Sequence, residues 1–208
     1  MGNGCIACSA VAVLVASGAQ GSTLGFSSLP GIEGLGFYSG TITWSYLGSG
    51  AGTVAFTLEN ESPSANGGYL TGIAFNVASG LSLTYASGLA GWSGISGVSA
   101  SPFPDFDYGA AIGGDWLGGG LADQGIAVDD VGTLVFSVTG ADALLSGLSA
   151  SAFLDGSSGY AFAARFRGFE DGGSDKVLGD PPTVPTPSAF AMAATGVLGS
   201  IIARRRRK

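Results

Sequence analysis

The sequence predicts an all-β protein whose body is an antiparallel β-sandwich of about seven to eight strands, jelly-roll-like or immunoglobulin-like. Two observations lead to this class. Several short segments alternate apolar and polar residues, which is typical of strands with one buried face. The 38 glycines separate these segments, and aromatic residues make up 10% of the chain, too many for a disordered protein. A signal helix is expected before this body and a transmembrane helix after it.

Four segments carry the alternating pattern most clearly. They are residues 41–46, 53–59, 133–139 and 161–169, in which apolar side chains occupy every second position. One buried face on each strand favours an antiparallel sheet. Further short strands are predicted for residues 69–77, 81–85 and 125–128.

The connections between these strands are also readable. Residues 48–52 are rich in glycine and join two predicted strands, so we expect a hairpin turn there. Residues 141–148 favour a short helix. Residues 88–120, which are rich in Gly, Ser and Ala, are predicted to form long loops.

The first 19 residues have the character of a signal peptide. An apolar run occupies residues 6–16, and the small residues Ser17 and Ala19 stand where a signal peptidase reads. We expect cleavage after Ala19. Both cysteines, Cys5 and Cys8, lie inside this leader, so the mature chain is expected to have neither a disulfide nor thiol chemistry.

The carboxyl-terminal residues combine three unlike features. Residues 180–187 form a proline-rich linker, residues 188–203 form an uncharged stretch, and residues 204–208 are all basic. A helix over residues 188–203 would be about 24 Å long, short but workable for a hydrocarbon core of about 30 Å. The basic end would stay in the cytoplasm, because each Arg or Lys at the bilayer centre costs about 2.5 to 3.5 kcal/mol.

Together these features resemble the PEP-CTERM sorting signal of bacterial exported proteins. The residues that carry the resemblance are the motif Val184, Pro185, Thr186, Pro187 and Ser188 and the membrane stop Arg204, Arg205, Arg206, Arg207 and Lys208. The family usually has Val-Pro-Glu-Pro, and Thr186 stands at the position of the glutamate.

The resemblance implies a route for the protein. Its partners would be an exosortase-type processing protease and, transiently, the inner membrane, before the protein reaches the cell surface or the extracellular space. Residues 20–179 would then be the extracytoplasmic domain. The alternative is a tail-anchored protein that is never processed.

The body of the chain is strongly acidic. Five of the eight basic residues are in the terminal cluster, so residues 20–183 hold three bases against 15 acids, and 3 − 15 gives a charge of −12. Such a surface repels phosphate backbones. Nucleic-acid binding is therefore excluded.

Few residues suit catalysis or ligand binding. The chain has no histidine, which removes histidine-based triads and nearly every zinc site. Asp105 and Asp107 are expected on a loop, where they are weak candidates for a calcium site. Asp129 and Asp130 could contribute to the same site. Either acid pair could also serve a glycosidase.

These residues and the terminal signals lead to an expected function. We expect a non-enzymatic exported protein of the cell surface or the exopolysaccharide matrix, with extracellular polysaccharide as a further partner and without a cofactor. The first alternative is a carbohydrate-binding module in which Trp92 and Trp116, which stand in glycine-rich segments, stack on sugar rings. The second is a glycoside hydrolase that uses the acid pairs.

Overall fold

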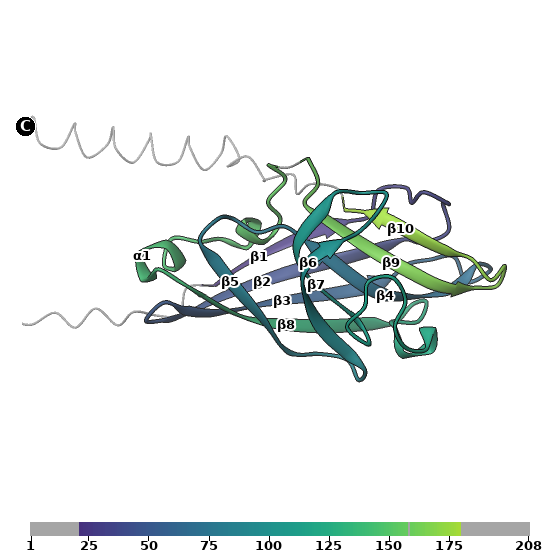
Figure 1. The fold of residues 1–208 in the computed structure, drawn as a ribbon, viewed down its shortest axis with the longest axis horizontal. Helices are drawn as coiled ribbons and strands as arrows, with labels where there is room; N and C mark the ends of the chain where they lie inside the picture. Colours follow the sequence, from purple (N-terminus) through teal and green to yellow (C-terminus); the bar gives the residue numbers. More distant parts are fainter. Residues whose placement is uncertain (1–20, 158, 180–208) are drawn as a thin grey trace, which may run out of the picture.

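Two antiparallel five-stranded sheets form the body of the protein in the computed structural model, which describes residues 21–157 and 159–179. The predicted β-sandwich is confirmed, with ten strands rather than about seven to eight. Sheet 1 has the order β1 (Gly21–Ser27), β2 (Tyr38–Gly48), β3 (Ala51–Asn60), β8 (Val131–Gly140), β5 (Leu81–Ser87). Sheet 2 has the order β10 (Ser174–Leu178), β9 (Phe162–Phe169), β4 (Gly67–Phe75), β7 (Asp105–Ile112), β6 (Trp92–Ser99). Figure 1 shows the two layers lying one over the other.

The β2–β3 hairpin shows how the alternating sequence becomes structure. Ile42 pairs with Phe56 and Trp44 pairs with Val54, and all four side chains are buried. The residues between them face outward, because successive side chains on a strand point to opposite sides. The predicted hairpin turn is present, and its φ angles are positive at Gly48, Ser49 and Gly50.

The outer face of sheet 1 carries hydroxyl side chains in rows. Thr41, Thr57 and Thr133 lie opposite one another on β2, β3 and β8. The hydroxyl oxygens of Thr57 and Thr133 are 3.0 Å apart, within hydrogen-bond distance. A second row crosses four strands with Ser45, Thr53, Ser137 and Thr84. Small hydroxylated residues suit a solvated sheet face.

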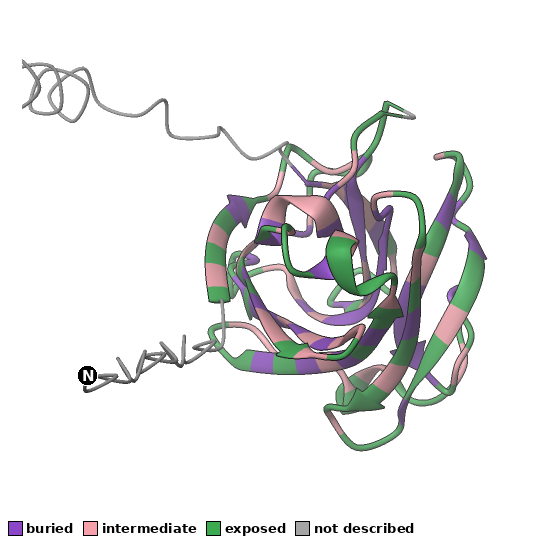
Figure 2. Ribbon diagram, turned by 90° about the vertical axis from the view of Figure 1, so that its left-hand side faces the viewer, coloured by how far each residue is buried: buried purple, intermediate pink, exposed green. Residues whose placement is uncertain are grey.

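The main core is a cluster of phenylalanine rings between the sheets. The ring of Phe56 on sheet 1 lies 4.4 Å from that of Phe75 and 6.1 Å from that of Phe162, both on sheet 2. Phe136 joins the cluster from β8, with its ring 5.9 Å from Phe56. Burial of each such ring contributes about 1.5 to 3 kcal/mol. The alternation of buried and exposed residues along the strands is visible in Figure 2.

The prediction of long loops over residues 88–120 is wrong, because β6 and β7 occupy much of this range. Strands β1 and β10 were also not predicted. In β6 the sequence WSGISGVS contains only three large apolar residues among Gly and Ser, so its alternation is weak. Pairing with β7, rather than local pattern, makes this segment a strand.

Two other predicted elements are smaller than expected. The strand at residues 125–128 reduces to a single bridge between Ile126 and Leu70. The helix at residues 141–148 reduces to the four-residue α1 (Asp142–Leu145). Two short 3-10 helices were not predicted: η1 (Ala122–Gln124) and η2 (Ala150–Phe153).

Sheet 2 has a second apolar cluster on its outer side. On β9 the side chain of Ala163 belongs to this cluster, whereas its neighbours Phe162 and Ala164 belong to the main core. Trp116 packs here as well, because the missing side chain of Gly72 leaves room for its ring. Loops therefore cover much of the outer face of sheet 2, which explains why β4 is buried on both faces.

One side of the sandwich is closed by hydrogen bonds between the edges of the two sheets. Ser28, just after β1, forms a bridge with Gly179, just after β10, and the amide of Leu29 donates to the carbonyl of Leu178 at 2.8 Å. The buried carboxylate of Asp175 on β10 holds the loop between β1 and β2. It accepts hydrogen bonds of 2.9 to 3.1 Å from the amides of Glu33, Leu35 and Gly36.

Several predictions fall on parts of the chain outside the described residues. These are the signal peptide at 1–19 with its cleavage site at Ala19, the linker at 180–187, the transmembrane helix at 188–203 and the basic tail at 204–208. None of the helices in the described part of the chain has the length and apolar character needed to cross a bilayer.

Asp175→Asn should destabilise the protein by about 1 to 3 kcal/mol, because an amide NH₂ would face backbone N–H groups that the carboxylate now satisfies. Urea unfolding of the purified chain measures this change. Asp171→Asn is the matched control, since Asp171 is exposed and only accepts from the nearby amide of Gly173. An equal loss in both variants would contradict the role assigned to Asp175.

Tyr38→Phe should stabilise the protein by about 1 kcal/mol at pH 7, because the buried hydroxyl of Tyr38 has no hydrogen-bond partner among the described residues. Burial raises the pKa of Tyr38 well above its ordinary value of 10.0. The unfolded chain therefore loses the phenol proton first, and the wild type loses stability as the pH rises above 10.

Urea unfolding at pH 7 and above pH 10 tests both parts of the Tyr38 prediction. The advantage of the Phe variant should grow with pH. Tyr69→Phe, at a half-buried residue, should change stability by less than about 0.5 kcal/mol at pH 7. A Tyr38→Phe variant that is clearly less stable than the wild type would show that the hydroxyl is hydrogen-bonded.

Candidate functional site

The two tryptophans expected to bind sugars are buried. Trp92 begins β6 and is 6% exposed, with its indole N–H donating to the carbonyl of Gln124 at 3.2 Å. Trp116 is 4% exposed and lies in the outer cluster of sheet 2. Trp116 lies in a loop as expected and Trp92 lies in a strand instead, but neither ring is exposed. For Trp116 the room is provided by Gly72 on β4, where a side chain would meet the indole ring at 3.3 Å.

The acidic candidates do not gather into one site. Asp105 and Asp107 lie on β7 rather than on a loop, and an oxygen of the Asp107 carboxylate accepts a hydrogen bond from the amide of Val77 at 3.0 Å. Asp129 and Asp130 lie in the turn before β8, where the amide of Asp129 donates to the carbonyl of Asn60. Among residues 21–157 and 159–179, no three acids or other metal-binding side chains come together to hold an ion.

One hollow lies on the side of the sandwich opposite the closed edges. There β5, the edge of sheet 1, runs beside β6, the edge of sheet 2. We call the hollow between them the β5–β6 groove. It has a volume of about 330 Å³ and is lined by Leu83, Thr84, Tyr85, Ser93, Gly94, Ile95, Ser96, Tyr108 and Phe136.

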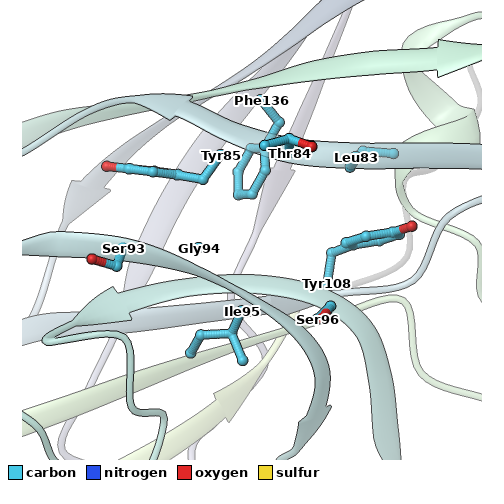
Figure 3. A pocket seen from close by; sticks show the side chains of 9 residues that line it. All are labelled: Leu83, Thr84, Tyr85, Ser93, Gly94, Ile95, Ser96, Tyr108 and Phe136. Carbon is cyan, nitrogen blue, oxygen red and sulfur yellow. The ribbon is translucent and has the colours of Figure 1, made fainter.

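Aromatic rings run along the floor of this groove. Phe136 lies between Tyr85 and Tyr108, whose hydroxyls point toward opposite ends of the groove (Figure 3). The rings of Tyr85 and Phe136 are 5.5 Å apart in an edge-on arrangement. Phe75 continues the row in the core, with its ring 5.2 Å from Phe136 and 6.4 Å from Tyr108. The groove floor is thus an extension of the main core.

Two glycines make room for Tyr85. A side-chain carbon on Gly94 would lie 2.4 Å from the Cβ of Tyr85, and one on Gly88 would lie 2.2 Å from its hydroxyl. The hydroxyl is buried without a hydrogen-bond partner among the described residues, and burial raises the pKa of Tyr85 above 10.0. Tyr85 is therefore a neutral, largely apolar part of the groove at physiological pH.

A smaller hollow continues the groove at one end. It has a volume of about 230 Å³ and shares Ser96 and Tyr108 with the first hollow. Its other lining residues are Val77, Ala78, Ser79, Gly80, Leu81 and Asp107. Asp107 is the only charged residue that lines either hollow.

The charged groups of the described body are concentrated elsewhere. Its three basic residues are Arg165 and Arg167 on β9 and Lys176 on β10, and all three donate hydrogen bonds to backbone carbonyls of loops. Arg167 reaches the carbonyls of Gly118 and Gly119 at 3.0 and 2.9 Å. Partial burial and the neighbouring Arg167 lower the pKa of Arg165. These cations hold the loops on sheet 2 and leave the groove uncharged.

The chemistry of the groove is that of a binding surface with aromatic rings, aliphatic side chains and a few hydroxyls. Sequence reasoning missed it because it forms only when β6 joins the opposite sheet from β5. One signal was available in the sequence. Residues 77–104 contain no charged residue, although the body around them is strongly acidic.

Comparison with known proteins adds no assignment to this geometry. No protein-family model, curated protein or solved structure matches the chain. The groove is therefore interpreted from its own residues.

The burial of Trp44, Trp92 and Trp116, each at most 6% exposed, should be visible in solution. We expect blue-shifted tryptophan emission and weak quenching by acrylamide in the folded chain, because indoles packed in apolar clusters are shielded from solvent. The same chain in urea is the control and should be quenched strongly. Strong quenching before unfolding, or a change on addition of neutral polysaccharide, would contradict the packing of Trp92 and Trp116.

Proposed function

We propose that this chain is the precursor of a non-enzymatic exported protein that resides at the cell surface or in the exopolysaccharide matrix. The observation that carries the proposal is the terminal sequence from Val184 to Lys208, in which a prolyl motif, an apolar stretch and a basic cluster occur in that order. An amino-terminal signal peptide that ends at Ala19 would start export, and an exosortase-type protease would process the other end.

The bounds of the described sandwich are compatible with such processing. The last described residue, Gly179, donates its amide to the carbonyl of Phe162 at 2.9 Å and forms a bridge with Ser28. Val184 follows five positions later in the sequence. A cut near Pro185 would therefore leave every strand and the closed side of the sandwich in the released product.

The body would act through contacts rather than turnover. A sandwich with a solvated hydroxyl face, buried aromatic core and uncharged groove is suited to packing and adhesion outside the cell. The carbohydrate-binding alternative depended on Trp92 and Trp116, and their burial removes the observation that favoured it. The glycosidase alternative depended on two acid pairs. In one of them, the carboxylate of Asp107 already accepts a hydrogen bond from the amide of Val77.

Intact mass of the protein from its native host tests the proposed route. We expect a product that begins at Gln20 and lacks the apolar stretch and Lys208. In a strain without the processing protease the product should keep Lys208.

A pair of proline variants sharpens the mass measurement. Pro185→Ala lies in the motif and should block processing, whereas Pro182→Ala lies in the linker before it and should not. Retention of Lys208 in every strain would instead indicate a permanent tail anchor. Retention of Met1 in a product from the cytosol would contradict export.

A further inference from the structure

We propose that the open side of the sandwich, formed by β5 and β6, binds a second copy of this chain by antiparallel strand pairing. The two β5–β6 grooves would face each other in the resulting dimer. This goes beyond the proposed route of export and does not depend on it.

The first argument is the contrast between the two sides of the sandwich. On the closed side, residues after β1 hydrogen-bond to β10, as described for Leu29 and Leu178. On the open side, no backbone hydrogen bond joins β5 to β6 within the described ranges 21–157 and 159–179. Both strands therefore keep one edge of N–H and C=O groups available for another strand.

The second argument is that these edges carry little of the usual protection against pairing. Natural proteins block free edges with charged residues, prolines or bulges. Neither β5 nor β6 contains a charged residue or a proline. The pairing of β5 with β8 is regular from Leu81 to Tyr85, and its register shifts only between Tyr85 and Ser87. A regular edge about 17 Å long is thus open to a partner.

The third argument is charge, and it shows where two copies of this chain can meet. The body carries 3 basic and 15 acidic residues, so two copies repel one another over most of their surfaces. The strands on the open side come from residues 77–104, which have no charge. Two acidic copies can therefore approach through this side at the lowest electrostatic cost.

Symmetry makes the two edges act together. A twofold axis perpendicular to both sheets would place β5 antiparallel to β5 of the second copy and β6 beside β6. Each five-stranded sheet would then continue into its counterpart. Leu83, Ile95 and Tyr108, which line the groove, would lose contact with water.

The expected dimer is weak. A seven-residue strand is about 24 Å long and a sandwich is about 20 Å thick, so each copy would bury about 500 Å². A total near 1,000 Å² lies at the low end for specific interfaces, and we expect a dissociation constant of about 10 to 100 µM. At a crowded surface the local concentration of copies can exceed this value.

Sedimentation equilibrium of the full chain in mild detergent tests the proposal. The wild type should dimerise with a dissociation constant of about 10 to 100 µM. This constant should fall about threefold or more as NaCl rises from about 0.05 to 0.5 M, because salt screens the repulsion between acidic copies. A dissociation constant that rises with salt would indicate an interface built on ion pairs and would overturn the proposal.

Three lysine variants give the decisive comparison. Thr84→Lys adds a charge at an exposed position of β5 and should weaken dimerisation at least about tenfold. Thr43→Lys adds the same charge at an exposed position of β2, away from the edge, and should leave the dissociation constant unchanged. Ser96→Lys, on β6, should act as Thr84→Lys does. If Thr84→Lys does not give the circular dichroism spectrum of the folded protein, Ser96→Lys is used in its place.

The remaining outcomes overturn the proposal. A wild type that stays monomeric throughout the concentration range would do so, as would equal dimerisation of all variants, which would place the contact elsewhere. A monomer that is retarded in a gel of neutral polysaccharide, with retardation lost in Thr84→Lys, would assign the groove to a glycan instead. All chains in the comparison share the same termini, so the result is independent of processing.

Discussion

Contact between the phenylalanine rings of the two sheets is the interaction on which the rest of the structure depends. Phe56 meets Phe75 and Phe162 across the interface, and Phe136 completes the cluster. These rings keep the sheets at the spacing of about 10 Å that is typical of sandwiches. With the spacing fixed, the neighbouring edges of the two sheets either form hydrogen bonds with each other or lie side by side without them. The closed and open sides of this protein are the two solutions.

Four charged groups in this protein hold loops in place. Asp175 binds backbone amides on the closed side, and Arg165, Arg167 and Lys176 bind backbone carbonyls around sheet 2. A charged group that satisfies several buried backbone groups contributes more than an exposed ion pair. The open side lacks charge for a separate reason, since residues 77–104 contain no charged residue.

The sequence predicted the parts of the fold in which large apolar residues alternate with polar ones. Residues 41–46 and 53–59 fall within β2 and β3, and the turn between them lies where glycine was found. Strands such as β6 were missed because Gly and Ser replace most of the side chains that would reveal a buried face. Local pattern cannot show that a segment is stabilised by a strand distant in the chain, as β7 is by β4.

The candidate site was harder to predict than the fold. Trp92 and Trp116 were expected to stack on sugar rings from glycine-rich segments, but both rings are buried, and Trp116 packs beside Gly72 from a distant part of the chain. The groove needs both sheets, so no single segment contains its pattern. The terminal signals differ in kind, since they depend on order and composition along a short stretch and are therefore readable without a fold.

The hydroxyl rows on sheet 1 have a consequence for the environment in which this protein can work. Threonine and serine side chains do not titrate near neutral pH, and they attract few counter-ions. The hydration of these rows should therefore change little with acidity or salinity, while Glu59 on the same face supplies an ionisable group at one end of β3. For the exported protein proposed above, a layer of molecules that presents these rows would keep its wetting properties through such changes.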